Sequence, residues 1–283
     1  MEIMQVWRQE ERTIRMSNNS IYINTCLFGD HLSRVQEYAQ AYGGRLGFEI
    51  LAMFDMPDFE QSLRENLALL QEHPVAFHGP VFRVEHAAPR GTRQYEESMH
   101  HVRLTLKYAR ILRSRHFTMH LNNGRVDPDR KEEMLANAHE NYKELQEMFG
   151  SFDCPVYIEN TGTILQKNML LDQQEFTQVC RDKKYDVLID IGHANANGWD
   201  IPRLIDDLRP QIRAYHLHNN DGIHDQHNRL HEGTIDFTSL LDKILKTTPD
   251  ADLIIEYTRR EKDGAGLHED IREVLETCDK TRE

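Results

Sequence analysis

Residues 214–237, AYHLHNNDGIHDQHNRLHEGTIDF, contain five histidines and only short apolar runs. A buried element would not tolerate so many imidazoles, because each buried ring needs a hydrogen-bond partner. Imidazole and carboxylate are ligands of divalent metals such as zinc and manganese, and Asp225 and His227 place two donors two residues apart. The turn signal NDG at 220–222 ends a strand near Leu217. The stretch therefore predicts a strand followed by a metal-binding loop; the alternative is a histidine-rich surface loop.

Short apolar runs alternate with longer amphipathic segments along the rest of the chain. The runs expected to form strands are residues 21–27, 45–51, 75–78, 116–121, 155–159, 187–190, 212–217 and 253–256. Helical spacing predicts helices at residues 35–42, 59–71, 96–113, 128–149, 173–182, 201–208, 237–245 and 268–277. Since no antiparallel hairpin signal occurs, the alternation predicts eight parallel βα units, which form a single (β/α)₈ TIM barrel.

The composition restricts the class of partner. The chain carries 34 Lys and Arg residues against 47 Asp and Glu residues, a net charge of −13. This balance disfavours nucleic-acid binding driven by charge, and a small-molecule partner is expected instead. No apolar run reaches the roughly 18 residues that a membrane span needs. The four cysteines are scattered without a CxxC pair, which indicates free thiols in a reducing cytosol, so a cytoplasmic location is expected.

The domain organisation is expected to be simple. No Gly/Ser-rich linker or change in composition divides the chain, so residues 20–283 are expected to form one barrel domain. Residues 1–19 contain no continuous apolar segment of the kind found in a secretory signal, so they are not expected to be one. They are expected to be a poorly ordered extension. Whether the barrel forms oligomers stays open.

Metal-type side chains occur at the ends of six consecutive predicted strands. They are His78, His120, Glu159, Asp190, His216 and Glu256. Three more lie in the loops after strands six and seven, namely His193, Asp225 and His227. Each has a structural alternative, since a strand-end carboxylate can cap the next helix and a His-Gly-Pro can be a turn. The carboxyl end of a TIM barrel is where such enzymes place their chemistry, so together the residues predict a divalent-metal site there.

As an ordered set, these motifs resemble the xylose isomerase-like TIM barrels, a superfamily that includes sugar isomerases and epimerases and endonuclease IV. The matching motifs are His78-Gly-Pro, His120, Glu159-Asn-Thr, Asp190-Ile-Gly-His193, His216-Leu-His-Asn, Asp225-Gln-His227, Gly233-Thr-Ile-Asp-Phe and Ile255-Glu256. The sequence departs from the usual pattern at two positions that border the substrate loop. Asn219 stands where relatives usually have Asp, and His231 stands where glycine is usual, so the substrate class is the feature left open.

The resemblance implies one to three ions, zinc or manganese, per chain. In the sugar isomerases and epimerases one ion is held by the set that corresponds here to Glu159, Asp190, His216 and Glu256. In endonuclease IV nine ligands hold three zinc ions, and residues matching all nine are present. There His78, His120 and Glu159 would hold the first zinc. Glu159, Asp190, His216 and Glu256 would hold the second zinc, so that Glu159 would bridge the first and second ions. His193, Asp225 and His227 would hold the third.

Three functional hypotheses follow. The first is a metal-dependent isomerase or epimerase of a sugar or sugar phosphate that moves a proton beside a carbonyl. In it Glu159 and Glu256 exchange the proton and His193 binds substrate oxygens. The second is an endonuclease IV-like phosphoesterase with three zinc ions. The third is a barrel that binds a ligand without turning it over, against which the number of acid/base candidates argues.

Residues near the predicted substrate loops bear on this choice. His218, Asn219 and Arg83 are the candidate substrate contacts. Residues 51–60, LAMFDMPDFE, contain no basic residue where a DNA-reading loop would want several. The only nearby basic set is Arg83, Arg90 and Arg93, which could equally bind one substrate phosphate. The isomerase or epimerase is therefore the favoured hypothesis.

Overall fold

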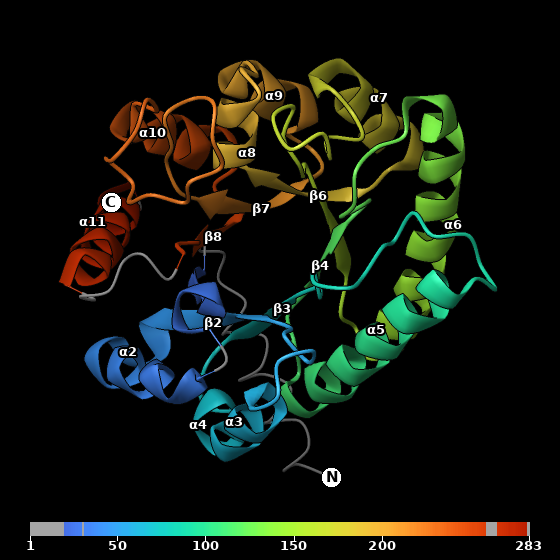
Figure 1. Cartoon of the computed structure of the whole chain (residues 1–283). Coiled ribbons are helices and arrows are strands. Elements are labelled where there is room, and N and C mark those ends of the chain that lie inside the picture. Colours follow the sequence, from blue (N-terminus) through green and yellow to red (C-terminus); the bar gives the residue numbers. More distant parts are fainter. Residues whose placement is uncertain (1–19, 30, 259–264, 282–283) are drawn as a thin grey trace, which may run out of the picture.

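The computed structural model describes residues 20–29, 31–258 and 265–281. Eight parallel strands close into a barrel in chain order, and helices surround it (Figure 1). The predicted (β/α)₈ architecture is therefore confirmed. The extension expected at residues 1–19 lies outside the described residues. Over the described part of the chain, no helix has both the length and the apolar character needed to cross a membrane.

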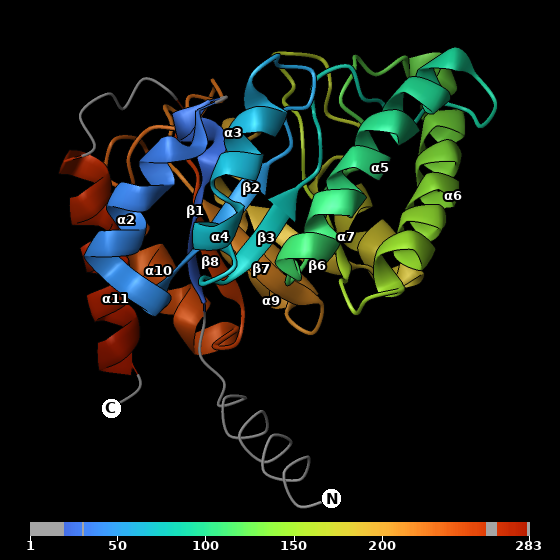
Figure 2. The ribbon, with the colours of Figure 1, turned by 90° about the horizontal axis from the view of Figure 1, so that it is seen from below.

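The strands are short, and they pair side by side in chain order around the barrel. They are β1 (Ile21–Asn24), β2 (Leu46–Leu51), β3 (Val75–His78), β4 (Phe117–His120), β5 (Val156–Glu159), β6 (Asp186–Asp190), β7 (Ile212–Leu217) and β8 (Asp252–Ile255). Each pairs in parallel with its neighbours, and β8 pairs with β1 to close the barrel. In Figure 2 the strands run upward, so their carboxyl ends and the loops that follow them lie at the top.

The strand period of two explains why apolar strands end in polar ligands. Tyr22, Ala76, Leu188, Ala214 and Ile254 form a small apolar cluster of their own, separate from the core that contacts the helices. Because side chains alternate between the two faces of a strand, the next inward position after each of these residues lies nearer the carboxyl end. Those next positions are Asn24, His78, Asp190, His216 and Glu256. Apolar packing therefore fills the lower barrel, and polar side chains occupy its upper end.

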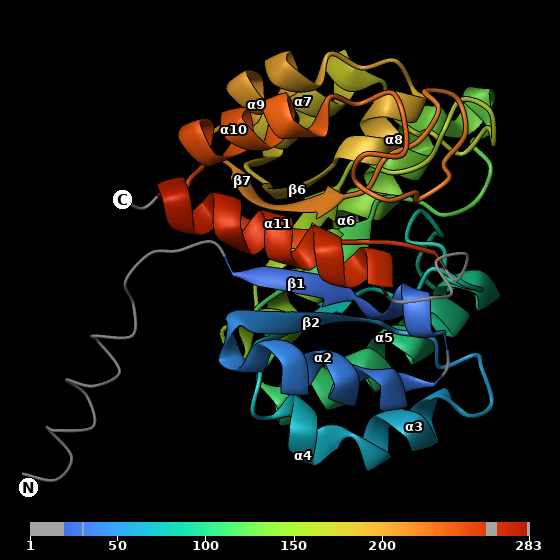
Figure 3. The same ribbon diagram turned by 90° about the vertical axis from the view of Figure 1, so that its left-hand side faces the viewer.

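The helices cover the outside of the barrel. They are α2 (Val35–Tyr42), α3 (Phe59–Glu65), α4 (Leu67–Leu70), α5 (Arg93–Leu112), α6 (Lys131–Gly150), α7 (Gln173–Lys183), α8 (Ile191–Ala196), α9 (Ile201–Leu208), α10 (Phe237–Thr247) and α11 (Ala265–Thr281). In Figure 3, α11 and α2 lie over the outer side of β1 and β2. Outward strand residues such as Ile23 and Phe48 belong to the one large core that includes apolar side chains of these helices.

Three elements differ from the sequence-based expectation. The first strand ends at Asn24 instead of residue 27, because the Asn24 side chain accepts the Cys26 N–H at 2.8 Å and starts a 3-10 turn. The helix expected at residues 59–71 breaks at Asn66, whose amide donates to the Ser62 carbonyl. The short helix α8 was not predicted; the Asp190 carboxylate caps its first turn through the His193 N–H.

The packing inside the barrel predicts a contrast between two glycines. A Cβ added at Gly47, in β2, would lie 2.5 Å from the Tyr22 ring and 2.8 Å from the Pro74 carbonyl oxygen. Gly47→Ala should therefore lower the free energy of unfolding by about 1–3 kcal/mol through overpacking. Gly44→Ala, where no atom lies within 4 Å of the added Cβ, is the matched control and should be neutral or slightly stabilising. Urea unfolding measures both, and equal midpoints for the two variants would contradict the described packing.

Candidate metal centre

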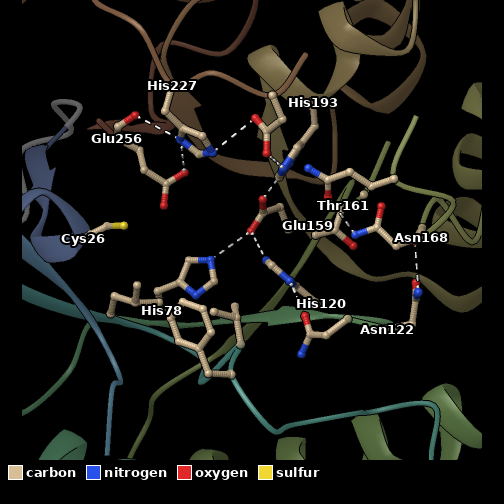
Figure 4. Close-up of a pocket in the computed structure, with 17 residues that line it drawn as sticks. Cys26, His78, His120, Asn122, Glu159, Thr161, Asn168, His193, His227 and Glu256 are labelled. Atoms are coloured by element: carbon tan, nitrogen blue, oxygen red, sulfur yellow. Dashed lines mark hydrogen bonds and ion pairs between the residues drawn. The ribbon is translucent and has the colours of Figure 1, made fainter. Parts of the chain in front are cut away.

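All nine predicted ligands come together at the carboxyl end of the barrel. Seven of them line one open cavity of about 430 Å³ (Figure 4), namely His78, His120, Glu159, His193, Asp225, His227 and Glu256. The other two, Asp190 and His216, are fully buried beneath it. Geometrically the nine residues fall into overlapping groups of three that could each hold a metal ion.

Glu159, the last residue of β5, lies at the centre of the site and joins its two halves (Figure 4). Its Oε2 atom lies 3.0 Å from His120 Nε2 and 3.3 Å from His78 Nε2. The other oxygen, Oε1, lies 3.2 Å from His193 Nδ1. One carboxylate can therefore serve ions on both sides, as a bridging ligand does.

A second group surrounds His216, which comes from β7. Its Nδ1 atom lies 3.3 Å from Glu256 Oε2, 3.6 Å from Glu159 Oε1 and 3.7 Å from Asp190 Oδ2. Ligands bonded to one ion at about 2.1 Å in a tetrahedron are separated from each other by roughly 3.4 Å. The three distances from His216 Nδ1 therefore match edges of a coordination shell. The ligand atoms of Glu159, Asp190 and His216 all lie within 4.8 Å of one another, whereas Glu256 groups with His216 and His78.

A third group joins His193 of α8 to Asp225 and His227 on the loop after β7. The Asp225 carboxylate lies 3.3 Å from His193 Nε2 through one oxygen and 3.2 Å from His227 Nε2 through the other. His227 has a φ of 48°, in the left-handed region that a non-glycine residue seldom adopts. Such backbone strain persists only where the surroundings hold it, and it is typical of functional sites.

The hydrogen-bond network assigns the ring nitrogens of two histidines. His78 donates from Nδ1 to the Gly79 carbonyl at 2.8 Å. His120 donates from Nδ1 to Asn123 Oδ1 at 2.7 Å, and the same Asn123 amide donates to the Val84 carbonyl, which identifies Oδ1 as the acceptor. In both rings the Nε2 lone pair is therefore left for a metal, as in histidine ligands whose other nitrogen is held by an outer partner.

Several buried atoms in this centre have no hydrogen-bond partner. They include Glu159 Oε1, His193 Nδ1, His216 Nδ1 and Asp225 Oδ1. A buried acceptor without a partner costs about 1–3 kcal/mol, so such atoms are rare in folded proteins. All four face other ligand atoms of the groups described above, and a cation would satisfy them together. The residues present therefore fit a divalent metal.

The titration of the centre reflects its excess of carboxylates. Burial disfavours the charged form of His78, yet the Glu159, Glu49 and Glu256 carboxylates raise the pKa of its ring to about 9. Asp225 likewise raises the pKa of the half-buried His227 ring to about 9. In return, and against the effect of burial, His120, His216 and His193 hold the pKa of Glu159 well below the usual range, and His193 and His227 do the same for the pKa of Asp225. Without a metal, protons on the imidazoles compensate the carboxylates.

Side chains outside the predicted set hold the ligands in place. Asn160 joins the ends of β5 and β6, donating to the Asp190 carbonyl and accepting the Asp190 N–H at 2.8 Å. His218 Nε2 lies 3.0 Å from both Asp190 oxygens. A Cβ at Gly192 would lie 1.9 Å from the His218 ring, so the glycine of the Asp-Ile-Gly-His motif makes room for this support. Asn160, Gly192 and His218 each belong to a motif quoted from the sequence, but the motifs did not reveal this supporting role.

The expected substrate contacts do not line the cavity. His218 and Asn219 are fully buried, His218 against Asp190 and Asn219 against the backbone of its own loop. Arg83 is exposed on the loop after β3, next to Phe82, which does line the cavity. We attribute the difference for His218 and Asn219 to burial of the first residues after β7, because the loop turns outward only beyond Asn220.

The cavity has two chemically distinct walls beside the ligands. The wall from the first three strands and their loops is mostly apolar and consists of Cys26, Leu51, Val81 and Phe82. The wall from the loops after β4 and β5 carries amides and a hydroxyl, namely Asn122, Asn123, Gln166, Asn168 and Thr161. Sequence reasoning did not identify these residues, because isolated loop amides and apolar side chains have no pattern that marks them as cavity-lining.

A match to a family model identifies the family of the chain. A family model described as xylose isomerase-like TIM barrel matches residues 38–279. The chain therefore belongs to this family, as the resemblance predicted. A curated relative, an uncharacterised protein of Methanocaldococcus jannaschii, is 25% identical over 150 residues. That match covers 51% of this chain and 50% of the relative, so the chain spans about half the length of the curated relative it matches.

Solved structures share the fold at low identity. A D-tagatose 3-epimerase-like protein has a TM-score of 0.76 at 19% identity, covering 93% of this chain and 100% of that chain. The IOLI protein, solved with a zinc atom, has a TM-score of 0.68 at 17% identity, with 93% and 96% covered. Endonuclease IV from Thermus thermophilus has a TM-score of 0.64 at 20% identity, with 91% and 99% covered. At these identities the likeness shows the fold alone.

The raised pKa values predict that zinc binding strengthens as the pH rises. Zinc must displace protons from His78 and His227, whose pKa values are raised from 6.5 to about 9. Apparent affinity should therefore increase between about pH 6 and 9, with protons released on binding, as calorimetry in buffers of different ionisation heat can measure. Over the same range the metal-free protein should lose stability, because the favourable ion pairs vanish as the rings deprotonate.

An exposed histidine on the same loop provides the control. His224 pairs with Asp221 outside the centre, so His224→Ala should leave the pH dependence unchanged. Zinc affinity that does not vary with pH, without proton release, would contradict the assignment of these rings as ligands.

Proposed function

We propose that this member of the xylose isomerase-like TIM barrel family is a divalent-metal-dependent isomerase or epimerase of a small carbohydrate. It would act by moving a proton at a carbon beside a carbonyl. One observation carries the proposal: two glutamates, Glu159 and Glu256, both reach the cavity, and their carboxylate oxygens lie 3.6 and 3.3 Å from His216 Nδ1. They come from separate strand ends, so each can face a different side of a bound substrate.

The charge and shape of the cavity support a small, uncharged substrate. Among the described residues that line it, none is a lysine or an arginine. Of the basic residues after β3, Arg90 pairs with Glu144 and Arg93 pairs with Glu97, so both are already engaged. A volume of about 430 Å³ suits a monosaccharide. The apolar wall can pack against carbon-bound hydrogens of a sugar ring, and the amide wall can bind its hydroxyl groups.

The roles of the side chains follow from this arrangement. Glu159, Asp190, His216 and Glu256 would hold a divalent ion, which would supply a Lewis acid for the substrate carbonyl. One glutamate then accepts the proton from the carbon next to the carbonyl, and that carboxylate becomes a carboxylic acid. For epimerisation, the other glutamate, protonated beforehand from solvent, delivers its proton to the opposite face of the same carbon and becomes a carboxylate. His193, at the cavity wall, donates a hydrogen bond to a substrate oxygen.

A phosphoesterase of the endonuclease IV kind is the second candidate, and one observation favours it. The three groups of ligand-type residues, nine residues in all, are present together and share Glu159 between two of them. A mononuclear isomerase has no need for Asp225 and His227 as ligands. The described cavity wall, however, lacks the cationic side chains that would neutralise a phosphate backbone. The two candidates therefore share a metal centre and differ in what surrounds it.

Solvent exchange tests the proposed chemistry directly. Metal-loaded protein incubated with candidate ketoses or inososes in D₂O should place deuterium at the carbon next to the carbonyl. Glu256→Gln keeps the size and one oxygen ligand of Glu256 but removes its basicity. We expect this variant to retain much of its metal and to lose roughly 10²–10⁴-fold in rate. Glu232→Gln, an exposed position outside the cavity, is the control and should match the unmodified protein.

The outcomes separate the two candidates. Turnover without deuterium incorporation, together with an unchanged rate in Glu256→Gln, would refute proton transfer by this residue. Cleavage of a duplex at an abasic site, with no exchange in any ketose tried, would establish the phosphoesterase instead.

A further inference from the structure

A fully buried carboxylate lies one layer below the metal centre and belongs to none of its ligand groups. It is Glu49, in β2, inside the barrel and outside the cavity lining. Its partner in β3 is the apolar Ala76, which belongs with Leu188 and Ala214 to the apolar cluster inside the barrel. Burial of an isolated carboxylate costs several kcal/mol unless it is paired and hydrogen-bonded. Its presence therefore has to be explained by its partners.

Four polar side chains surround Glu49. Its Oε2 atom accepts from His216 Nε2 at 2.9 Å and from Asn24 Nδ2 at 2.7 Å. Its Oε1 atom accepts from Thr118 Oγ1 at 3.0 Å, and His116 Nε2 lies 3.5 Å away. Every one of these groups can donate a hydrogen bond, which is what an ionised carboxylate requires. Glu49 is thus a hydrogen-bond acceptor on both oxygens.

This arrangement decides which nitrogen of His216 faces the metal centre. An ionised carboxylate can only accept, so His216 must carry its proton on Nε2 and direct it at Glu49. The lone pair of Nδ1 is then left on the side where Glu159, Asp190 and Glu256 converge. A carboxylate behind a histidine in this way orients the ring and raises its strength as a ligand.

The same carboxylate also holds Glu256 through Asn24. The Asn24 amide donates to Glu49 Oε2 and, at 2.9 Å, to Glu256 Oε1. That contact leaves Glu256 Oε2 directed at His216 Nδ1. Two ligands of the centre, His216 and Glu256, are therefore positioned by Glu49, one directly and one through an amide.

We propose that Glu49 is a positioning residue of the metal centre, presetting the His216 tautomer and, through Asn24, the Glu256 carboxylate. The proposal rests on the metal-binding part of the proposed function and not on the choice between isomerase and phosphoesterase. It assigns Glu49 no contact with substrate, since the residue lies beneath the cavity and does not line it.

The test is zinc affinity in two substitutions and a matched control. Glu49→Gln keeps the shape; its oxygen can accept from His216 and Asn24 while its amide donates to Thr118, so the fold is preserved and only the charge is lost. Glu49→Leu removes both acceptors. The control is Tyr215→Phe, which deletes the buried hydrogen bond between Tyr215 and Thr248 on the outer face of β7, the strand that carries His216. Thermal unfolding by circular dichroism measures the stability of each metal-free protein.

Competition with a chelator and nitrogen NMR of the His216 ring provide the readouts. We expect Glu49→Gln to weaken zinc binding by roughly 10–100-fold and Glu49→Leu to weaken it further. In Glu49→Leu the ring should also lose its single tautomer. Tyr215→Phe should bind zinc like the unmodified protein, even if it is less stable. If Glu49→Leu does not fold, the affinity of Glu49→Gln alone decides the matter.

Two results would overturn the proposal. One is zinc affinity that is unchanged in Glu49→Gln. The other is an equal loss of affinity in Tyr215→Phe, which would assign the effect to general destabilisation. If the unmodified protein binds zinc but shows neither solvent exchange nor phosphoester cleavage, the proposed function fails while the role of Glu49 stands. If it binds no zinc, both fail.

Discussion

Four buried carboxylates within one end of the barrel form the constraint on which the rest of the structure depends. Glu49, Glu159, Asp190 and Glu256 are each at most 6% exposed and lie around a single histidine, His216. Carboxylates at this distance repel each other and lose the solvation of water, so the arrangement needs positive charge. The imidazoles supply it through raised pKa values, and in the proposed metal-bound state a divalent cation would supply it instead. The Asn160 amide holds the Asp190 backbone in place, and Gly192 leaves the space that the His218 ring occupies next to this cluster.

The barrel and its candidate ligands could be predicted from sequence, because side chains alternate regularly between the two faces of each strand. A strand that is apolar along most of its length and polar at its last inward position, as in Val187-Leu-Ile-Asp190, marks both the strand and the ligand. Six such strands, among eight βα units in order, predicted the barrel and its site, and the structure brings all nine candidate ligands to one rim. Local hydrogen bonds decided the rest. Asn24 ended its strand early, and Asn66 broke a helix, because their side chains bond to nearby backbone groups.

The irregular part of the site could not be predicted for a different reason. Glu49 lies within the strand LGFEIL, where a single polar residue has no partner that sequence spacing can identify. The role of Glu49 depends on hydrogen bonds to side chains of β1, β4 and β7, which only the closed barrel brings together. His218 and Asn219, predicted as substrate contacts, are fully buried and do not line the cavity, because the loop becomes exposed only beyond Asn220. The substrate class depends on such loop positions, so it is the least predictable property of the chain.

The central claim is that the side chains around His216 form a metal centre of fixed geometry, and locating the ion tests it most directly. Crystals soaked in zinc and measured at the zinc absorption edge would give its position without any assumption about activity. The account predicts an anomalous peak among Glu159, Asp190, His216 and Glu256, with bonds of about 2.0–2.3 Å and the His216 bond through Nδ1. Zinc found only at exposed histidines such as His224 and His231, with the centre empty of it, would contradict the account.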